Sequence, residues 1–201
     1  MFQINNIVFI EGVSGVGKTT ASTLLYNKIQ DMGLNVSCFL EGDDTNPLDP
    51  FKGTYPPPVP ISLFSEIYMQ CWQEFTINQS DNNFILILDG TFFHHQINDL
   101  ICEYNTTDEF IINHLVNLLE VVQKFKPVVF YLSSSDIAQR LNQACESRKK
   151  PIPTDDKIAF WENRKRIDLL ALDKLPVESH ILNIDGGWDE ITDIITDVII
   201  G

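Results

Sequence analysis

Short apolar runs recur along the chain and alternate with longer stretches in which apolar and polar residues mix. The runs are apolar at nearly every position, as expected for strands buried on both faces of a parallel sheet. Five runs show this pattern: Ile4–Ile10, Asn35–Leu40, Phe84–Leu88, Val128–Leu132 and His180–Ile184. The pattern therefore predicts a five-stranded, mostly parallel sheet.

The stretches between these runs carry apolar residues at helical spacing. Gly33 is placed to end the first stretch, and Thr106-Thr107-Asp108-Glu109 has the spacing of a capping box. The predicted helices are Lys18–Met32, Ile61–Ile77, a helix that opens at Thr106 and ends before Pro127, Asp136–Ser147, Asp155–Leu172 and Trp188–Ile199. Strands that alternate with such helices form βαβ units, which predicts a single α/β domain over residues 1–201 with three layers, αβα.

Composition and charge restrict the classes of partner that we expect for this protein. The chain has 201 residues, of which 44% are apolar, and a formal net charge of −14. Because nucleic-acid binders usually carry a basic surface, we expect no nucleic-acid partner. No basic leader and no apolar run of the roughly 20 residues that span a bilayer is present, so we also expect no membrane partner. Four cysteines without a Cys-x-x-Cys pair fit reduced thiols in a cytoplasmic protein. The oligomeric state stays open, with a homodimer as one alternative.

The segment after the first predicted strand is rich in glycine and ends in Lys-Thr-Thr. It matches G-x-x-x-x-G-K-[ST] between a strand and a helix, which is the setting of a phosphate-binding loop. In such a loop, backbone N–H groups surround the β-phosphate, the lysine reaches the β- and γ-phosphates, and the following hydroxyl is a ligand of Mg²⁺. The predicted nucleotide-binding residues are Gly12, Val13, Ser14, Gly15, Val16, Gly17, Lys18, Thr19 and Thr20, with Lys18 catalytic and Thr19 a metal ligand. The predicted cofactors are ATP, or another nucleoside triphosphate, and Mg²⁺.

A second acidic element is expected where an apolar strand ends. Asp89 follows the run Phe84–Leu88 and is the candidate carboxylate that positions Mg²⁺ through water. The alternative is that Asp89 only caps a turn with Gly90.

Three common classes of nucleotide-binding protein lack their signatures in this sequence. The nearest string to the Asn-Lys-x-Asp element of GTPases, residues 27–31, is one residue too long and lies inside the first predicted helix. The transporter signature Leu-Ser-Gly-Gly-Gln is absent, and the length leaves no room for the helical lid domain of AAA proteins. A small-molecule kinase remains.

The positions of the arginines support a kinase. All four, Arg140, Arg148, Arg164 and Arg166, fall within 27 consecutive residues of this acidic chain. Phosphoryl transfer needs cations that close over the β- and γ-phosphates and exclude water. We therefore predict a helical lid over about 147–155, with Arg140 and Arg148 in catalytic roles. The alternative is a solvated basic turn that pairs with nearby acids.

On these residues the chain resembles a known family. Glu11-Gly12 leading into Gly15-x-Gly17-Lys18-Thr19-Thr20 is similar to the start of thymidylate kinase and its P-loop nucleoside and nucleotide kinase relatives. Val129–Leu132 followed by Asp136-Ile-Ala-Gln-Arg140 resembles their strand into the lid helix, and Leu40-Glu41-Gly42-Asp43 is similar to an element of a bacterial branch of this superfamily. The resemblance implies a P-loop kinase fold over most of the chain, but its motifs are specific only in the loop.

Two departures from the thymidylate kinase pattern bear on the acceptor. Ser14 stands where those kinases carry an acidic residue, and Gly90 stands where they carry the arginine that binds the acceptor phosphate. Moreover, no lysine or arginine occurs from Gly53 to Gln123, which is expected to line the acceptor side. A doubly charged phosphate would need a paired cation there, so an acceptor with a free hydroxyl and little charge is favoured. Lid arginines could still reach an acceptor phosphate.

The candidate catalytic base lies after the second predicted strand. Ligands of open α/β sheets bind outside the carboxyl ends of the strands, and a carboxylate there can accept the proton of an attacking hydroxyl. Glu41 is the first choice for this base and Asp43 the second. The alternative is an acidic loop that faces water.

An acceptor pocket is expected around the loop and helix at about 42–78. Its candidate residues are Phe64, Tyr68, Gln70, Trp72 and Phe92, although ordinary core packing also explains most of these side chains. The sequence thus predicts an ATP- and Mg²⁺-dependent phosphotransferase that acts on a hydroxyl of a small molecule such as a nucleoside, a sugar-like compound or an antibiotic. The alternatives are a nucleoside monophosphate kinase and, from another class, a regulatory nucleotide-binding protein.

Overall fold

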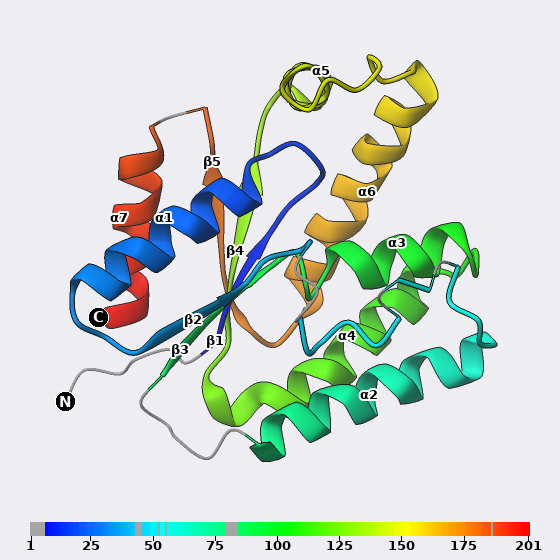
Figure 1. Cartoon of the computed structure of the whole chain (residues 1–201). Coiled ribbons are helices and arrows are strands. Elements are labelled where there is room, and N and C mark those ends of the chain that lie inside the picture. The colour runs from blue at the N-terminus through cyan, green and yellow to red at the C-terminus, as the bar shows by residue number, and fades with distance from the viewer. Residues whose placement is uncertain (1–6, 43–45, 52, 55, 79–83, 186) are drawn as a thin grey trace.

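Five parallel strands form the centre of the molecule, in the order β2-β3-β1-β4-β5 (Figure 1). The computed structural model describes residues 7–42, 46–51, 53–54, 56–78, 84–185 and 187–201. The strands are β1 (Ile7–Glu11), β2 (Val36–Phe39), β3 (Ile85–Asp89), β4 (Val128–Ser133) and β5 (Glu178–Asn183). Every pairing between them is parallel, so their carboxyl ends meet at one edge of the sheet.

Helices cover both faces of this sheet, as the sequence predicts. The α-helices are α1 (Lys18–Asp31), α2 (Ile61–Asn78), α3 (His94–Cys102), α4 (Asp108–Val122), α5 (Ile137–Ser147), α6 (Asp155–Lys174) and α7 (Trp188–Ile200), with a short 3₁₀ turn at Gln123–Phe125. α1 and α7 pack together on one face, whereas α2, α3, α4 and most of α6 lie on the other (Figure 1). The predicted three-layer α/β fold is therefore confirmed.

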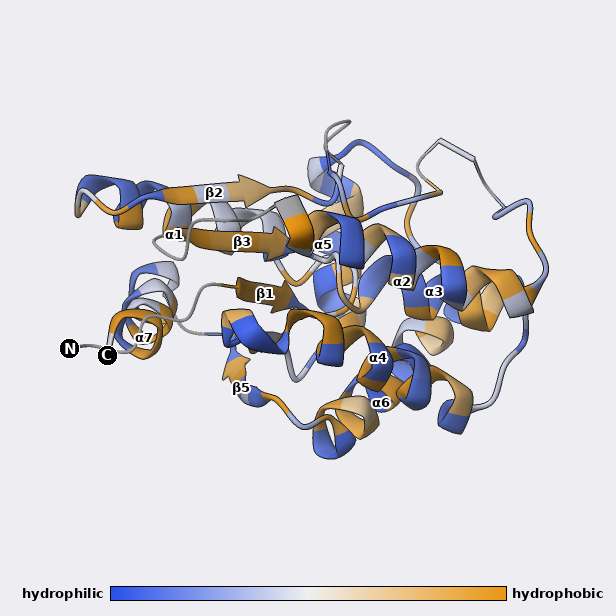
Figure 2. Cartoon of the chain, turned by 90° about the horizontal axis from the view of Figure 1, so that it is seen from below, coloured by the Kyte–Doolittle hydropathy of each residue, from blue (hydrophilic) through white to orange (hydrophobic). Residues whose placement is uncertain are grey.

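Alternation along the strands divides the apolar core in two. Ile7 and Phe9 of β1 pack towards α2 and α4, while Val8 and Ile10 pack towards α1 and α7. Figure 2 shows the apolar residues concentrated along β1 and β3, with polar residues on the outer sides of the helices. Glu11 continues the odd-numbered set, so its carboxyl group is fully buried on the side of α2 and α4.

Element boundaries agree closely with the sequence, with two differences. β2 and β5 form the edges of the sheet and are partly exposed, whereas the sequence pattern predicted burial on both faces. α3 is not predicted at all, because its nine residues carry several polar side chains and follow directly on the aromatic pair Phe92-Phe93. Residues 4–6 of the first predicted strand lie outside the described residues.

Helix ends follow local chemistry. Thr107 caps α4 by accepting a hydrogen bond from the Phe110 N–H at 3.2 Å, and Asp136 caps α5 by accepting one from the Gln139 N–H at 2.8 Å. Gly33 has φ 76° directly after α1, a left-handed conformation that favours glycine. Within the described part of the chain, no helix is both long enough and apolar enough to cross a membrane.

Candidate active site

The glycine-rich loop joins β1 to α1 at the carboxyl edge of the sheet. Gly12 has φ 141°, and a Cβ atom built on it would lie 2.5 Å from the backbone oxygen of Leu132 on β4. Gly17 has φ 88°, and a Cβ there would lie 2.4 Å from the indole of Trp188 at the start of α7. Because L side chains fit neither the conformation nor the space, glycine is required at both positions.

Lys18 is held inside this loop. Its ammonium group donates to the backbone oxygens of Gly12 at 3.1 Å and Val13 at 3.4 Å, and the residue is only 5% exposed. The loop therefore has the wrapped form that a phosphate-binding loop needs, with the lysine charge at its centre.

Thr19 and Asp89 meet beneath the loop. The Thr19 hydroxyl donates to Asp89 Oδ2 at 2.6 Å, and the Glu41 backbone N–H approaches the same oxygen at 3.4 Å. Burial raises the pKa of Asp89, while the Thr19 hydrogen bond and the Lys18 charge oppose that rise. Asp89 Oδ1 is buried without a partner among the described residues. The Thr19 hydroxyl lies beside the Asp89 carboxylate, whose Oδ1 has no partner among the described residues, and this pair of oxygen groups fits the predicted Mg²⁺ site.

Glu41, Lys18 and His94 form a closed triangle of contacts. Lys18 Nζ lies 3.4 Å from Glu41 Oε2 and 3.4 Å from His94 Nδ1, and His94 Nε2 lies 3.3 Å from Glu41 Oε1. Strand order explains the meeting, because β2 and β1 flank β3 and their carboxyl ends bring all three residues to one point. The sequence pattern did not place His94 beside Glu41, because α3, which positions His94, was not predicted.

Glu41 and Arg148 line one polar pocket together with the glycine-rich loop. The lining residues are Ser14, Gly15, Gly17, Lys18, Thr19, Thr20, Glu41 and Arg148. The pocket thus brings together residues predicted from three separate stretches of sequence. Asp43, the second candidate for the base, lies outside the described residues.

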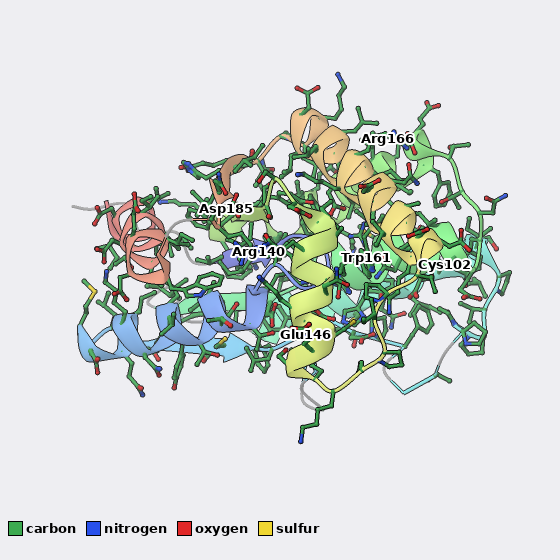
Figure 3. The ribbon with its side chains drawn as sticks, turned by 90° about the horizontal axis from the view of Figure 1, so that it is seen from above. Cys102, Arg140, Glu146, Trp161, Arg166 and Asp185 are labelled. Atoms are coloured by element: carbon green, nitrogen blue, oxygen red, sulfur yellow. The ribbon has the colours of Figure 1, made fainter. Side chains whose placement is uncertain are left out.

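The remaining arginines of the predicted basic cluster make other contacts. Arg140 donates to Asp185 at 2.9 Å and to the Ile184 backbone oxygen at 3.1 Å (Figure 3), so it ties α5 to the end of β5. Arg166 pairs with Asp108 at the surface, and Arg164 is fully buried. These arginines are close together in the sequence but lie apart in the structure, because α5 and α6 pack against different neighbours. A catalytic role for Arg140 stays a prediction.

The predicted acceptor residues do not line one open pocket. Phe64, Tyr68, Trp72 and Phe92 are all buried in the core between the sheet and α2, α3 and α4. Gln70 points the other way on α2 and donates to Glu74 at 2.8 Å. The helical repeat separates Gln70 from the aromatic face. The Tyr68 hydroxyl and the Trp72 indole N–H are buried without partners among the described residues, so a role in acceptor binding stays a prediction for them.

A buried polar network that the sequence did not indicate lies on the α6 side of this site. Arg164 Nε donates to Asp168 Oδ1 at 2.8 Å, and the Tyr131 hydroxyl donates to Asp168 Oδ2 at 3.0 Å. Arg164 and Asp168 are both completely buried. Arg164 also donates to the backbone oxygen of His94 at 3.2 Å, which connects α6 to the triangle. An Arg-x-x-x-Asp spacing on a helix was the one available signal, and it does not distinguish a buried pair from an exposed one.

The buried carboxyl group of Glu11 leads to a testable prediction about how stability depends on pH. Burial raises the pKa of Glu11 to about 8, against the opposing effects of the Lys18 charge and a hydrogen bond of 2.8 Å from the Phe92 N–H. The unfolded chain loses this proton near pH 4.5, whereas the folded protein keeps it to about pH 8. Between these values the folded state binds more protons, so this carboxyl makes the unfolding free energy fall as pH rises, by up to about 1.4 kcal/mol per pH unit.

Glu11→Gln removes this contribution. The stability of the variant relative to wild type should therefore increase steadily between about pH 5 and about pH 8, as measured by urea unfolding at several pH values. The exposed Glu74→Gln is the matched control and should show no such trend. A stability difference between Glu11→Gln and wild type that is independent of pH would contradict the buried, protonated carboxyl.

Comparisons with known proteins support the fold. No protein-family model matches the chain, and neither does any curated protein sequence. Among solved structures, the YorR protein of Bacillus subtilis, crystallised in complex with phosphorylated GDP, is similar with a TM-score of 0.59 and 10% sequence identity. The match covers 96% of this chain and 95% of that chain. The likeness shows that this chain shares the α/β fold of that structure.

Proposed function

We propose that the protein is an ATP- and Mg²⁺-dependent phosphotransferase that moves the γ-phosphate to a hydroxyl of a small molecule. The observation that carries the proposal is the pocket in which Glu41 and Arg148 face the phosphate-binding loop. It brings the three parts that phosphoryl transfer needs into one place: a phosphate cradle, a carboxylate that can accept a proton, and a cation from the lid. The similar YorR structure contains phosphorylated GDP, which supports a nucleotide as the ligand and leaves the choice between ATP and GTP open.

In the proposed reaction, each residue acts on a stated atom. The loop N–H groups and Lys18 hold the β- and γ-phosphates, and Arg148 neutralises charge that spreads over the γ-phosphoryl oxygens in the transition state. The acceptor oxygen bonds to the γ-phosphorus as the bond to the β–γ bridging oxygen breaks, and the hydroxyl proton passes to Glu41. Mg²⁺, held by Thr19 and Asp89, would stabilise the negative charge on the phosphate oxygens.

The proposed acceptor is a nucleoside, a sugar-like compound or an antibiotic. The stretch from Gly53 to Gln123, which contains α2, α3 and α4, has no lysine or arginine. A phosphate group on the acceptor would therefore have to be bound by the lid. An uncharged acceptor needs no such cation, which favours a free hydroxyl on a weakly charged molecule.

Acceptor-dependent ADP release tests this function. Nucleosides, nucleoside monophosphates and alcohols related to aminoglycosides and chloramphenicol would be screened with wild type, and the active acceptor would then be assayed with Glu41→Gln. The amide cannot take a proton, so we expect turnover to fall roughly 10²-fold while ATP affinity is kept. Glu74→Gln is the matched control. Wild-type turnover in Glu41→Gln would show that another residue is the base. If none of the acceptors raises ADP release above basal hydrolysis, the protein binds nucleotide without kinase activity.

A further inference from the structure

We propose that His94 is the positioning residue of the catalytic base: it holds the Glu41 carboxylate in place when Lys18 leaves that carboxylate for the phosphates of the bound nucleotide. This inference rests on the proposed function, because it assigns a partner to the base of that reaction. It is carried by the geometry of the triangle, by the packing that fixes the His94 ring, and by the glycine that makes room for both.

The contacts of His94 define its tautomer. The Lys18 ammonium can only donate, so we assign His94 Nδ1, 3.4 Å away, as the acceptor. The His94 ring also has a hydrogen bond with the Gly12 backbone. Nε2 then carries the proton and lies 3.3 Å from Glu41 Oε1. Burial, followed by the nearby charges of Lys18 and Arg164 and by His95, lowers the pKa of His94, in agreement with a neutral ring. One side chain thus connects the phosphate-binding lysine to the carboxylate.

Two residues of α6 hold His94 in this orientation. The Trp161 indole stacks on the imidazole, with ring centroids 5.3 Å apart and planes at 18°. One turn further along, Arg164 donates to the His94 backbone oxygen at 3.2 Å. Both the ring and the main chain of His94 are therefore fixed by the helix that follows the predicted lid. A surface histidine would not be fixed in this way, and His94 is only 8% exposed.

Gly90 supplies the space that this arrangement needs. A Cβ atom built on Gly90 would lie 3.0 Å from Glu41 Oε2, 3.0 Å from Lys18 Cε and 3.4 Å from His94 Cβ, and its φ is 63°. Any side chain at this position would press on Glu41 and Lys18. Gly90, which stands where the resemblance to thymidylate kinases places an arginine, thus leaves room for Glu41 and Lys18 beside His94.

The triangle also gives an order of events. With Lys18 beside Oε2 and His94 beside Oε1, both oxygens of Glu41 are engaged. A nucleotide draws the Lys18 ammonium towards its β- and γ-phosphates, because these carry more negative charge than one carboxylate. Oε2 is then released to accept the acceptor's proton, while His94, whose Nε2 lies 3.3 Å from Oε1, keeps the carboxylate from turning away. The base becomes available only when nucleotide is bound.

Two amide substitutions separate the two ring nitrogens. In His94→Gln the side-chain N–H₂ takes the place of Nε2 and can still donate to Glu41, whereas the shorter side chain of His94→Asn reaches only the place of Nδ1. We expect His94→Asn to lower kcat roughly 10- to 100-fold, the range found for residues that orient a catalytic group, with KM for ATP within about threefold of wild type. His94→Gln should retain kcat within about fivefold. His180→Asn, which alters the histidine paired with Glu178 on β5, is the matched control and should behave as wild type.

The double variant with Glu41→Gln isolates the coupling. If His94 acts through Glu41, His94→Asn should add almost nothing to the loss that Glu41→Gln already causes. Equal losses in His94→Asn and His94→Gln, a loss confined to KM, or a full additional loss in the double variant would overturn the proposal. If wild-type protein shows no acceptor-dependent turnover, the proposed function itself is wrong. That result is distinct from the outcomes that would overturn only the role of His94.

A measurement on the unaltered protein covers the case in which a variant does not fold. Nitrogen NMR of the histidine rings should show His94 as the neutral Nε2–H tautomer, both in the free protein and with a non-hydrolysable ATP analogue and Mg²⁺. The Nδ1–H tautomer, or a protonated ring in the nucleotide complex, would contradict the hydrogen bond to Glu41. The chain has four histidines, which keeps the assignment tractable.

Discussion

Lys18→Ala is expected to abolish nucleotide turnover, with a loss of at least about 10²–10³-fold in rate and a clear loss of ATP affinity. The ammonium group is the charge at the centre of the glycine-rich loop, and it also fixes the backbone oxygens of Gly12 and Val13. The substitution therefore removes both the cation that meets the β- and γ-phosphates and a contact that shapes the loop. ATP affinity by titration calorimetry and ADP release give the two readouts.

Lys28→Ala is the matched control for this experiment. Lys28 lies on the same helix, is partly exposed and pairs with Asp193 on α7, away from the pocket. Lys28→Ala should leave ATP affinity and the rate of ADP release within about twofold of wild type. Lys28 lies away from the pocket, and an exposed ion pair such as Lys28–Asp193 contributes little to stability. Unchanged ATP affinity and rate in Lys18→Ala would remove the argument that this loop holds phosphate.

Arg164→Leu is expected to produce the largest loss of stability. Arg164 and Asp168 have completely buried side chains, and the substitution leaves the carboxylate without its cationic partner. Breaking a buried pair from one side typically costs about 3–5 kcal/mol, which corresponds to a fall in Tm of roughly 6–20 °C for a protein of this size. Burial already raises the pKa of Asp168 and the Arg164 charge opposes that rise, so Asp168 should take up a proton when Arg164 is lost.

Arg166→Leu on the same helix controls for the loss of an arginine. Arg166 is 54% exposed in its side chain and pairs with Asp108 at the surface, so its loss should cost no more than about 1 kcal/mol. The double variant Arg164→Leu/Asp168→Leu should recover part of the stability, since no unpaired charge then remains inside. Similar Tm values for Arg164→Leu and Arg166→Leu would show that the buried pair contributes nothing beyond a surface pair.

Lys18→Ala and Arg164→Leu both alter side chains at the carboxyl edge of the sheet, but the two variants test different properties of the protein. Lys18 tests the phosphate-binding loop, which local sequence specifies. Arg164 tests the α6 network behind His94, which no local pattern indicates. A variant that loses stability but keeps nucleotide affinity would therefore separate the support of the site from the site itself.

Local patterns in the sequence determined most of the fold and the phosphate-binding loop. Continuous apolar runs indicated the strands, because a strand buried on both faces needs apolar residues at every position. The glycine and lysine spacing of residues 12–18 indicated the loop, because that backbone conformation and charge are required within a few consecutive residues. Glu41 and Asp89 were predicted to lie near this loop for a related reason: each comes at the end of a strand, and parallel strands end at the same edge.

Only the tertiary structure decided which distant side chains meet. The tertiary structure places His94 beside Glu41 and separates the arginines that are clustered in the sequence. It also buries the aromatic residues predicted to bind the acceptor in the core. Those outcomes depend on strand order and on how α3 and α6 pack, and residues 53 positions apart, such as Glu41 and His94, share no local signal. Sequence spacing constrains contacts within one element, whereas contacts between elements follow from packing of the whole chain. The form of the glycine-rich loop was therefore predictable from the sequence, and the contact between His94 and Glu41 was not.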